Sequence, residues 1–193
     1  GYVYKWSSTV TNTGTVAWDT GWINVRLGTN GATPVQVTCQ SNPASCPDMP
    51  VGGSFWVEKC SYGTDVINCR EDLPTWNFKF SADGSNWLSC PGGTYPGGGA
   101  ASNYNNKVCS IDLGTINPGT PKTIYFQLTV PSTATEGKYP FIVQAMGWAD
   151  ATYAVAGTYD ILEVGTIIGD IILAFIGFLS IFGGLAAIAY SVI

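Results

Sequence analysis

The sequence contains no histidine, which removes the side chain that proteins use most often as a metal ligand and as a general base near neutral pH. A serine–histidine–aspartate or cysteine–histidine site is therefore excluded, because each needs an imidazole to take the proton of the nucleophile. A D-x-[DN]-x-[DN]-G calcium loop is also missing, and the glycine-rich CPGGTYPGGGAAS lacks the lysine of a phosphate-binding loop. We therefore expect no catalytic residue, no metal site, no cofactor and no enzymatic activity.

Charged residues are scarce, at 11% of the chain, and the formal net charge is -5. The 8 lysines and arginines are scattered along the sequence instead of being grouped. Neutralising a phosphate backbone needs a cluster of bases, so nucleic acid is not expected as a partner.

Four acidic residues of the central region are candidates for acid and base catalysis: Asp65, Glu71, Asp72 and Asp83. A pair of carboxylates can act as acid and base in hydrolysis. Turn and hairpin positions, however, are where aspartate ordinarily accepts local hydrogen bonds. We expect a structural role for these four residues.

Six cysteines lie in the middle of the chain, at Cys39, Cys46, Cys60, Cys69, Cys90 and Cys109. An even number of cysteines without a C-x-x-C pair and without histidine favours disulfides over zinc. Pairing of sequence neighbours closes compact loops, which favours Cys39 with Cys46, Cys60 with Cys69 and Cys90 with Cys109. Stable disulfides indicate an oxidising compartment outside the cell. The first residue is Gly1, and we expect a processed product whose leader has been removed.

Apolar and polar residues alternate with a period of two in several short segments. Trp76, Phe78 and Phe80 share one face of such a segment, and the Asp83-Gly84 pair indicates a hairpin. About nine strands and no helical periodicity before residue 164 predict an all-β sandwich. It covers residues 1–163, and residues 39–109 form a cysteine-containing insertion.

The sequence is rich in aromatic residues, with 7 tryptophans and 10 tyrosines. One interpretation is a platform on which a carbohydrate stacks. The other is a sandwich core, since many of these residues fall at inward-alternating positions. We expect core positions for Tyr4, Trp6, Trp76, Phe78, Phe126 and Phe141, and leave Trp18, Trp22, Trp56, Trp87 and Trp148 open.

Two segments resemble the Ig-like domains of prokaryotic cell-surface proteins, including archaeal ones. STVTNTGTVAWDT near the start has the N-x-G turn after an early strand. LGTINPGTPKTIYFQLTVPSTATEGKYPFIVQAMG has a PG before a strand of the x-I-x-F-x-L-x-V type, followed by the P…A..G.Y.f.V pattern. The resemblance implies an Ig-like sandwich and transfers no catalytic residue. The long cysteine-bearing middle departs from the pattern.

The chain ends in an apolar run. Residues 171–193 contain no charged side chain, and as a helix they would extend for about 34 Å, enough to cross a bilayer core. We predict one hydrophobic, transmembrane-type α-helix over residues 164–193. No lysine or arginine follows Lys138, although cytoplasmic flanks normally carry them.

Small residues recur along this predicted helix at spacings of three or four, and a small face lets helices approach closely. They are Gly165, Gly169, Ala174, Gly177, Ser180, Gly184, Ala187 and Ser191. General enrichment of glycine and alanine in membrane helices remains the alternative. Asp170 is expected either to be hydrated at the interface or to pair with another subunit.

These observations predict an exported structural protein that assembles with itself through its C-terminal helix and exposes the sandwich. The assembly is a homo-oligomer or polymer in an envelope, a virion or a filament. Its expected partners are other copies, membrane lipid or envelope proteins, on the outer face of a cell membrane or virion. Two rivals remain: a membrane-anchored adhesin that binds carbohydrate or protein, and an accessory subunit of a membrane complex.

Overall fold

The fold is all-β. The computed structural model describes residues 1–38, 54–60, 66–149 and 152–165. Within these residues the chain forms eleven strands and one short 3-10 helix. They are β1 (Val3–Thr11), β2 (Trp18–Leu27), β3 (Thr33–Thr38), β4 (Ser54–Lys59), η1 (Val66–Cys69), β5 (Lys79–Ser81), β6 (Leu88–Ser89), β7 (Ser102–Tyr104), β8 (Val108–Ile116), β9 (Pro121–Thr129), β10 (Gly137–Ala149) and β11 (Thr152–Val164).

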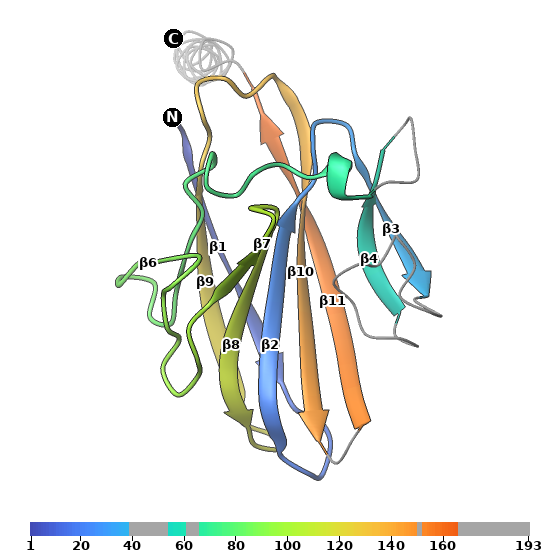
Figure 1. Ribbon diagram of the computed structural model, residues 1–193, viewed down its shortest axis with the longest axis vertical. Coiled ribbons are helices and arrows are strands. Elements are labelled where there is room, and N and C mark those ends of the chain that lie inside the picture. The colour runs from blue at the N-terminus through green and yellow to red at the C-terminus, as the bar shows by residue number, and fades with distance from the viewer. Residues whose placement is uncertain (39–53, 61–65, 150–151, 166–193) are drawn as a thin grey trace, which may run out of the picture.

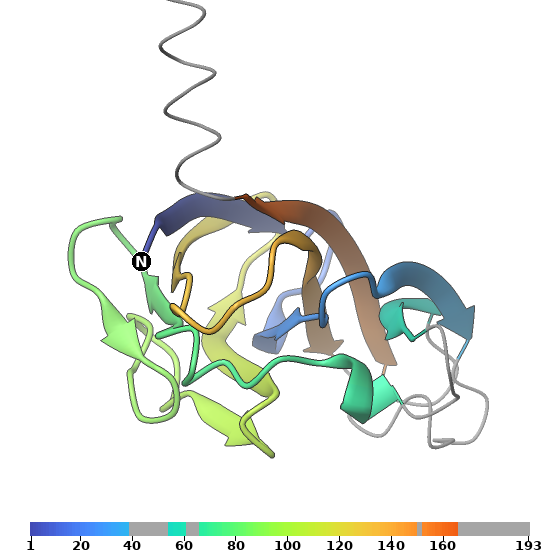
Figure 2. The same cartoon turned by 90° about the horizontal axis from the view of Figure 1, so that it is seen from above.

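The strands form two main antiparallel sheets, which lie face to face in Figures 1 and 2. One sheet has the order β1-β9-β5-β6, and the other has the order β11-β10-β2-β8-β7. Strands β3 and β4 pair with each other in a separate hairpin, which contacts β10 and β11. The edge strands β1 and β11 lie on the same side of the molecule.

The core lies between the two main sheets and follows the period-two alternation of the strands. In β9, Ile124, Phe126 and Leu128 are fully buried, while the residues between them are only partly buried. Ile23, Val25 and Leu27 of β2 supply the facing layer. Side chains from both sheets therefore form one continuous hydrophobic cluster.

The aromatic residues expected in the core divide into two groups. Trp76, Phe78, Phe126 and Phe141 are buried in the hydrophobic cluster. Tyr4 and Trp6 are partly buried and pack against the cluster from edge strand β1. Of the residues left open, Trp18 also packs against the core, and the side chain of Trp148 lies outside the described part of the chain.

The number of strands differs from the expectation of about nine. The additional strands include β6 and β7, which have two and three residues. Strands this short show too few alternations to be recognised from the sequence. Strands β5, β6 and β7 lie within residues 39–109, so part of the expected insertion belongs to the main sheets.

The end of the described domain is strand, since Val164 pairs with Gly137 in the β10–β11 ladder. Strand β11 therefore runs one residue past the predicted boundary at residue 163. None of the described residues forms a helix long and apolar enough to cross a membrane. The predicted helix from residue 166 onward lies outside the described residues.

The glycine-rich loop before β7 packs tightly against the sheet. Gly114 of β8, against which Gly97 and Gly98 of this loop pack, adopts a φ of 66°, a conformation that favours glycine. A Cβ atom on Gly98 would collide with the carbonyl oxygen of Asp112. The glycines of this loop thus allow backbone to approach backbone, a structural role that needs no phosphate ligand.

Candidate functional site

The outer face of the five-stranded sheet carries a buried arginine. Arg26 lies between the core residues Val25 and Leu27 in β2, and alternation therefore points its side chain away from the core. It is nevertheless fully buried, and it contacts Trp56 and Glu58 of β4.

Arg26 belongs to a cluster of three charged side chains with no exposed surface. The Nε atom of Arg26 lies 3.3 Å from Oε1 of Glu58, and Nε of Arg70 lies 2.9 Å from Oε2 of Glu58. Arg26 also donates a hydrogen bond from Nη2 to Oε1 of Gln144 at 2.9 Å and another to the carbonyl oxygen of Trp56. We call Arg26, Glu58 and Arg70 the ion cluster.

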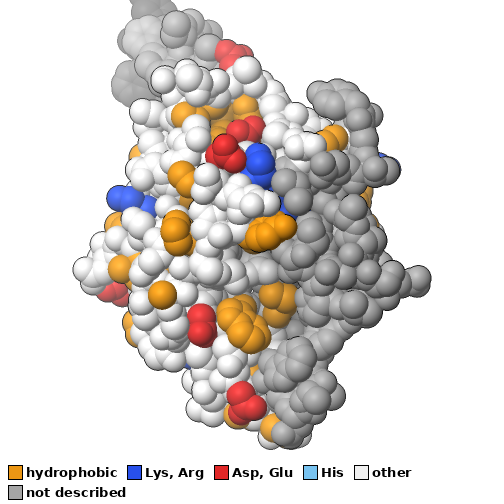
Figure 3. All heavy atoms as spheres, in the orientation of Figure 1, with side chains coloured by type: hydrophobic (Ala, Val, Ile, Leu, Met, Phe, Trp, Pro, Cys, Tyr) orange, Lys and Arg blue, Asp and Glu red, His pale blue; other side chains and the backbone are white. Residues whose placement is uncertain are grey.

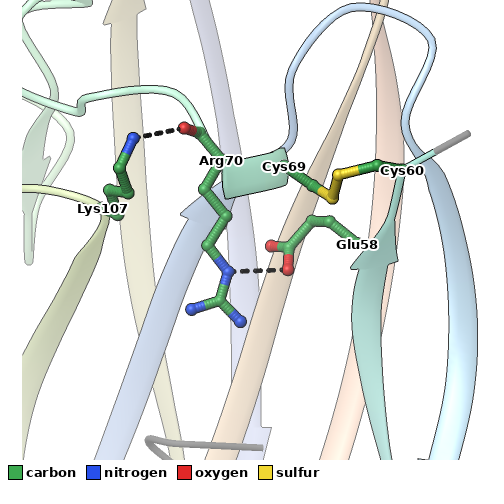
Figure 4. Close-up of a disulfide and its surroundings, with 5 residues drawn as sticks. All are labelled: Glu58, Cys60, Cys69, Arg70 and Lys107. Carbon is green, nitrogen blue, oxygen red and sulfur yellow. Dashed lines mark hydrogen bonds and ion pairs between the residues drawn. A yellow bond between two sulfur atoms is a disulfide. The ribbon is translucent and has the colours of Figure 1, made fainter. Parts of the chain in front are cut away.

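A disulfide lies next to two members of the ion cluster, Glu58 and Arg70. Cys60 is joined to Cys69, with 5.4 Å between their Cα atoms; Glu58 precedes Cys60 by two residues, and Arg70 follows Cys69 directly (Figure 4). Lys107 donates a hydrogen bond from Nζ to the carbonyl oxygen of Arg70 at 2.7 Å. The arrangement fastens β4 and η1 to the sandwich, and the three side chains of the ion cluster are completely buried.

A second disulfide lies in the core itself. Cys90 and Cys109 are bonded, with 6.1 Å between their Cα atoms, and Cys109 is fully buried. Two of the three pairings favoured by sequence spacing therefore occur. Cys39 and Cys46 lie outside the described residues.

A cleft is lined by residues of the two edge strands β1 and β11, which approach each other near the top of Figure 2. Its volume is about 200 Å³. The lining comes from β1, β10 and β11 and consists of Trp6, Ser7, Ser8, Phe141, Val143, Thr158, Tyr159 and Asp160. We call it the edge cleft.

The floor of the edge cleft is apolar. Phe141 and Val143 are 1% and 5% exposed. The Trp6 ring meets the Phe141 ring edge to face, with 4.2 Å between centroids. The buried Nε1 of Trp6 has no hydrogen-bond acceptor among the described residues. A buried donor without a partner ordinarily costs about 1–3 kcal/mol, which makes this atom an exception that needs an explanation.

The rim of the edge cleft is polar where alternation predicts apolar residues. Leu162 of β11 faces the core, so Asp160 and Thr158 share its side of the strand. On β1, Trp6 and Val10 pack with the core, so Ser8 between them shares that side. The upper end of the edge cleft is closed by a hydrogen bond from the Tyr4 hydroxyl to the carbonyl oxygen of Glu163.

Most of the predicted helix-packing positions fall beyond the described chain. Gly165 is exposed at the end of β11. The other positions lie outside the described residues: Gly169, Asp170, Ala174, Gly177, Ser180, Gly184, Ala187 and Ser191. Neither the ion cluster nor the edge cleft was among the expected sites.

The central acidic residues that can be examined make structural contacts. Glu71 accepts a hydrogen bond from Nε1 of Trp76 at 3.3 Å, and Asp72 pairs with Lys107 at 3.2 Å. Asp65 lies outside the described residues. In the described ranges, no three cysteine, aspartate or glutamate side chains form a group able to hold a metal ion.

Asp83 caps the turn after β5. Its Oδ1 accepts hydrogen bonds from the backbone N–H groups of Ser85 and Asn86, both at 2.8 Å, and from the Ser81 hydroxyl at 2.9 Å. The bonds from Asn86, Ser85 and Ser81 lower the pKa of the Asp83 carboxyl well below its usual range.

This lowered pKa predicts a pH-dependent contribution to stability. Folding favours the ionised carboxylate, so the contribution is present above the unfolded pKa of about 4 and is lost as pH falls toward the folded pKa. We expect Asp83→Asn to be less stable than the wild type at pH 7, with a smaller difference at about pH 2.5. Urea unfolding midpoints of both proteins test this, and a difference independent of pH would contradict it.

Comparison with known proteins assigns no family. No protein-family model matches the chain, and no curated protein matches it either. A solved structure described as "AvmM Catalyzes Macrocyclization in Alchivemycin A Biosynthesis" is 12% identical, with 86% of this chain and 82% of that chain covered. The TM-score of this match is 0.39, which is too low to support an inference about fold or activity.

Proposed function

We propose that this protein is an exported, non-enzymatic structural subunit that assembles with copies of itself at a cell or virion surface. Its sandwich, of the Ig-like kind suggested by the sequence resemblance, forms the exposed part, and the apolar C-terminal segment supplies cohesion. The single observation that carries the proposal is the uncharged run of residues 171–193 after a disulfide-bonded all-β domain.

The arrangement of the described domain supports this division of labour. Strand β1 begins and β11 ends at the same end of the sandwich (Figure 1). The sequence after Gly165 therefore continues from that end, and the rest of the domain extends away from it. On the face shown in Figure 3, acidic and basic side chains are isolated or adjacent to each other instead of forming a patch of one sign.

Substitutions on the small-residue face test how the assembly is held together. We expect Gly177→Leu with Gly184→Leu to reduce assembly about tenfold, because bulky side chains prevent close helix approach. The β domain of the full-length double variant should keep the unfolding temperature that it has in the full-length wild type. Electron microscopy and sedimentation of the full-length protein measure assembly, and Ala189→Leu, on the bulkier side of the predicted helix, is the matched control.

Three results would contradict the proposal. The first is wild-type assembly by the double variant, which would remove the small-residue face from the mechanism. The second is a native particle that contains a cofactor-bearing partner, which would favour an accessory subunit of a membrane complex. The third is free thiols on the cysteines of the native protein, which would argue against an extracellular location.

A further inference from the structure

The edge cleft is not used by the proposed assembly through the C-terminal segment. It sits where both main sheets end, since β1 pairs with β9 and β11 pairs with β10 in the described part of the chain. Each of these two strands also has exposed apolar side chains, Val3 on β1 and Tyr159 and Ile161 on β11.

The size of the edge cleft suits one small ring. Its volume is about 200 Å³, and a cavity of about 150 Å³ is sufficient to hold benzene. The lining takes only Ser7 and Ser8 next to Trp6 from β1, and residues 158–160 from β11. The Tyr4 to Glu163 hydrogen bond crosses the gap above these residues, so an added β-strand cannot lie along its full length.

The lining of the edge cleft is apolar on its floor and polar on its rim. Trp6, Phe141 and Val143 provide an aromatic and aliphatic floor. Ser8, Thr158 and Asp160 provide hydroxyl groups and a carboxylate at core-facing positions of the rim. Polar residues on the core-facing side of a strand break the binary pattern, and such departures are expected at functional sites.

A sugar ring has the complementary two faces. Its C–H groups pack on an aromatic floor, and its hydroxyl groups both donate and accept hydrogen bonds. The Trp6 indole in the lining supplies the aromatic face on which these C–H groups would pack. Asp160 uses Oδ1 to accept from the N–H of Ile161 at 2.8 Å, and its negative charge disfavours an acidic sugar.

We propose that the edge cleft between β1 and β11 binds a single neutral sugar unit, with Trp6 and Asp160 as its principal contacts. This activity goes beyond the proposed structural role, since it gives the exposed part of each subunit a weak carbohydrate-recognition site. Repetition of the site in an assembly would strengthen attachment to a glycan-coated surface through multivalency.

The test measures sugar binding by the purified full-length protein with saturation-transfer NMR. The probes are glucose, galactose, mannose and N-acetylglucosamine, with glucuronic acid as the acidic counterpart. We expect saturable binding of at least one neutral sugar with a Kd on the order of 1 mM, the weak range expected of so small a ligand. Glucuronic acid should bind at least about fivefold more weakly, because it meets Asp160 with like charge.

Two variants separate binding from folding. Trp6→Phe replaces the indole by a smaller ring and so reduces the aromatic floor, and Asp160→Ala changes an exposed rim residue. Each should weaken binding about tenfold, because Trp6→Phe removes part of the stacking surface and Asp160→Ala removes one hydrogen-bond acceptor. Asp19→Ala removes an exposed acid of β2 that does not line the cleft and should bind as the wild type does.

Several outcomes would overturn this inference. They are absence of saturable transfer from all four neutral sugars, equal affinity for glucuronic acid, and unchanged affinity in both Trp6→Phe and Asp160→Ala. Loss of self-association in Asp160→Ala would instead assign the cleft to a contact between copies. Assembly of each variant is imaged in parallel, so failure of sugar binding is distinguished from failure of the proposed structural role.

Discussion

Glu58→Gln is expected to lower the free energy of unfolding by about 3–5 kcal/mol. Glu58 bridges Arg26 and Arg70 at 3.3 and 2.9 Å, and all three side chains are fully buried. Removal of the carboxylate charge leaves two desolvated guanidinium groups without the negative charge between them. For a protein of this size each kcal/mol lowers the unfolding temperature by about 2–4 °C, so a decrease of about 6–20 °C is expected.

The matched control for this prediction is Glu163→Gln. Glu163 also pairs with a base, Lys138, at 3.0 Å, but both side chains are about 70% exposed. Exposed ion pairs contribute only about 0–1 kcal/mol. Thermal unfolding followed by circular dichroism should therefore separate the two variants clearly. Equal unfolding temperatures would show that the ion cluster does not hold the β3–β4 hairpin in place.

Replacement of Cys90 and Cys109 together by alanine is expected to lower the free energy of unfolding by about 2–5 kcal/mol. The two cysteines are separated by 19 residues in sequence, and the entropy model assigns about 3 kcal/mol to a closed loop of this length. The loop contributes Tyr95 and Ala101 to the hydrophobic core. Loss of the bond therefore frees the unfolded chain and leaves a small gap in the core.

Chemical denaturation with and without a reducing agent tests this prediction. Dithiothreitol should destabilise the wild type more than Cys90→Ala/Cys109→Ala, because the variant has one disulfide fewer to lose. Thiol labelling of the native protein should find Cys60, Cys69, Cys90 and Cys109 unreactive, since all four are bonded. The prediction fails if the double variant unfolds at the wild-type denaturant concentration.

The local pattern of the sequence was sufficient for the fold class and for part of the core. Trp76, Phe78 and Phe126 are buried as their alternation predicted, because side-chain direction in a strand is a local property with a period of two. The Asp83-Gly84 turn was likewise visible, since Asp83 satisfies backbone groups only two or three residues away. Each of the two observed disulfides joins a cysteine to the next cysteine in the sequence, as expected when the bond closes a short loop.

The ion cluster was not predictable in this way. Arg26 occupies an outward position in the apolar segment WINVRL, and a single base at such a position is ordinarily solvated. It is buried because Glu58 of β4 and Arg70, directly after η1, lie over that face, although both are distant from Arg26 in sequence. The one feature of the sequence that could have indicated a buried arginine was its position between two apolar core residues.

An all-β domain could be predicted from the order of the residues, as could the lack of histidine chemistry, the disulfide-forming cysteines and the uncharged terminal run. The tertiary structure adds that β1 and β11 are the edges of different sheets and that Trp6, Phe141 and Asp160 line one cleft. Alternation along a strand sets the side to which each residue points. The packing of two sheets, whose strands are far apart in the sequence, sets which residues lie opposite it. In the sequence, Asp160 is only a polar residue in an apolar strand. In the folded protein, it lines the same cleft as the Trp6 indole of the opposing sheet.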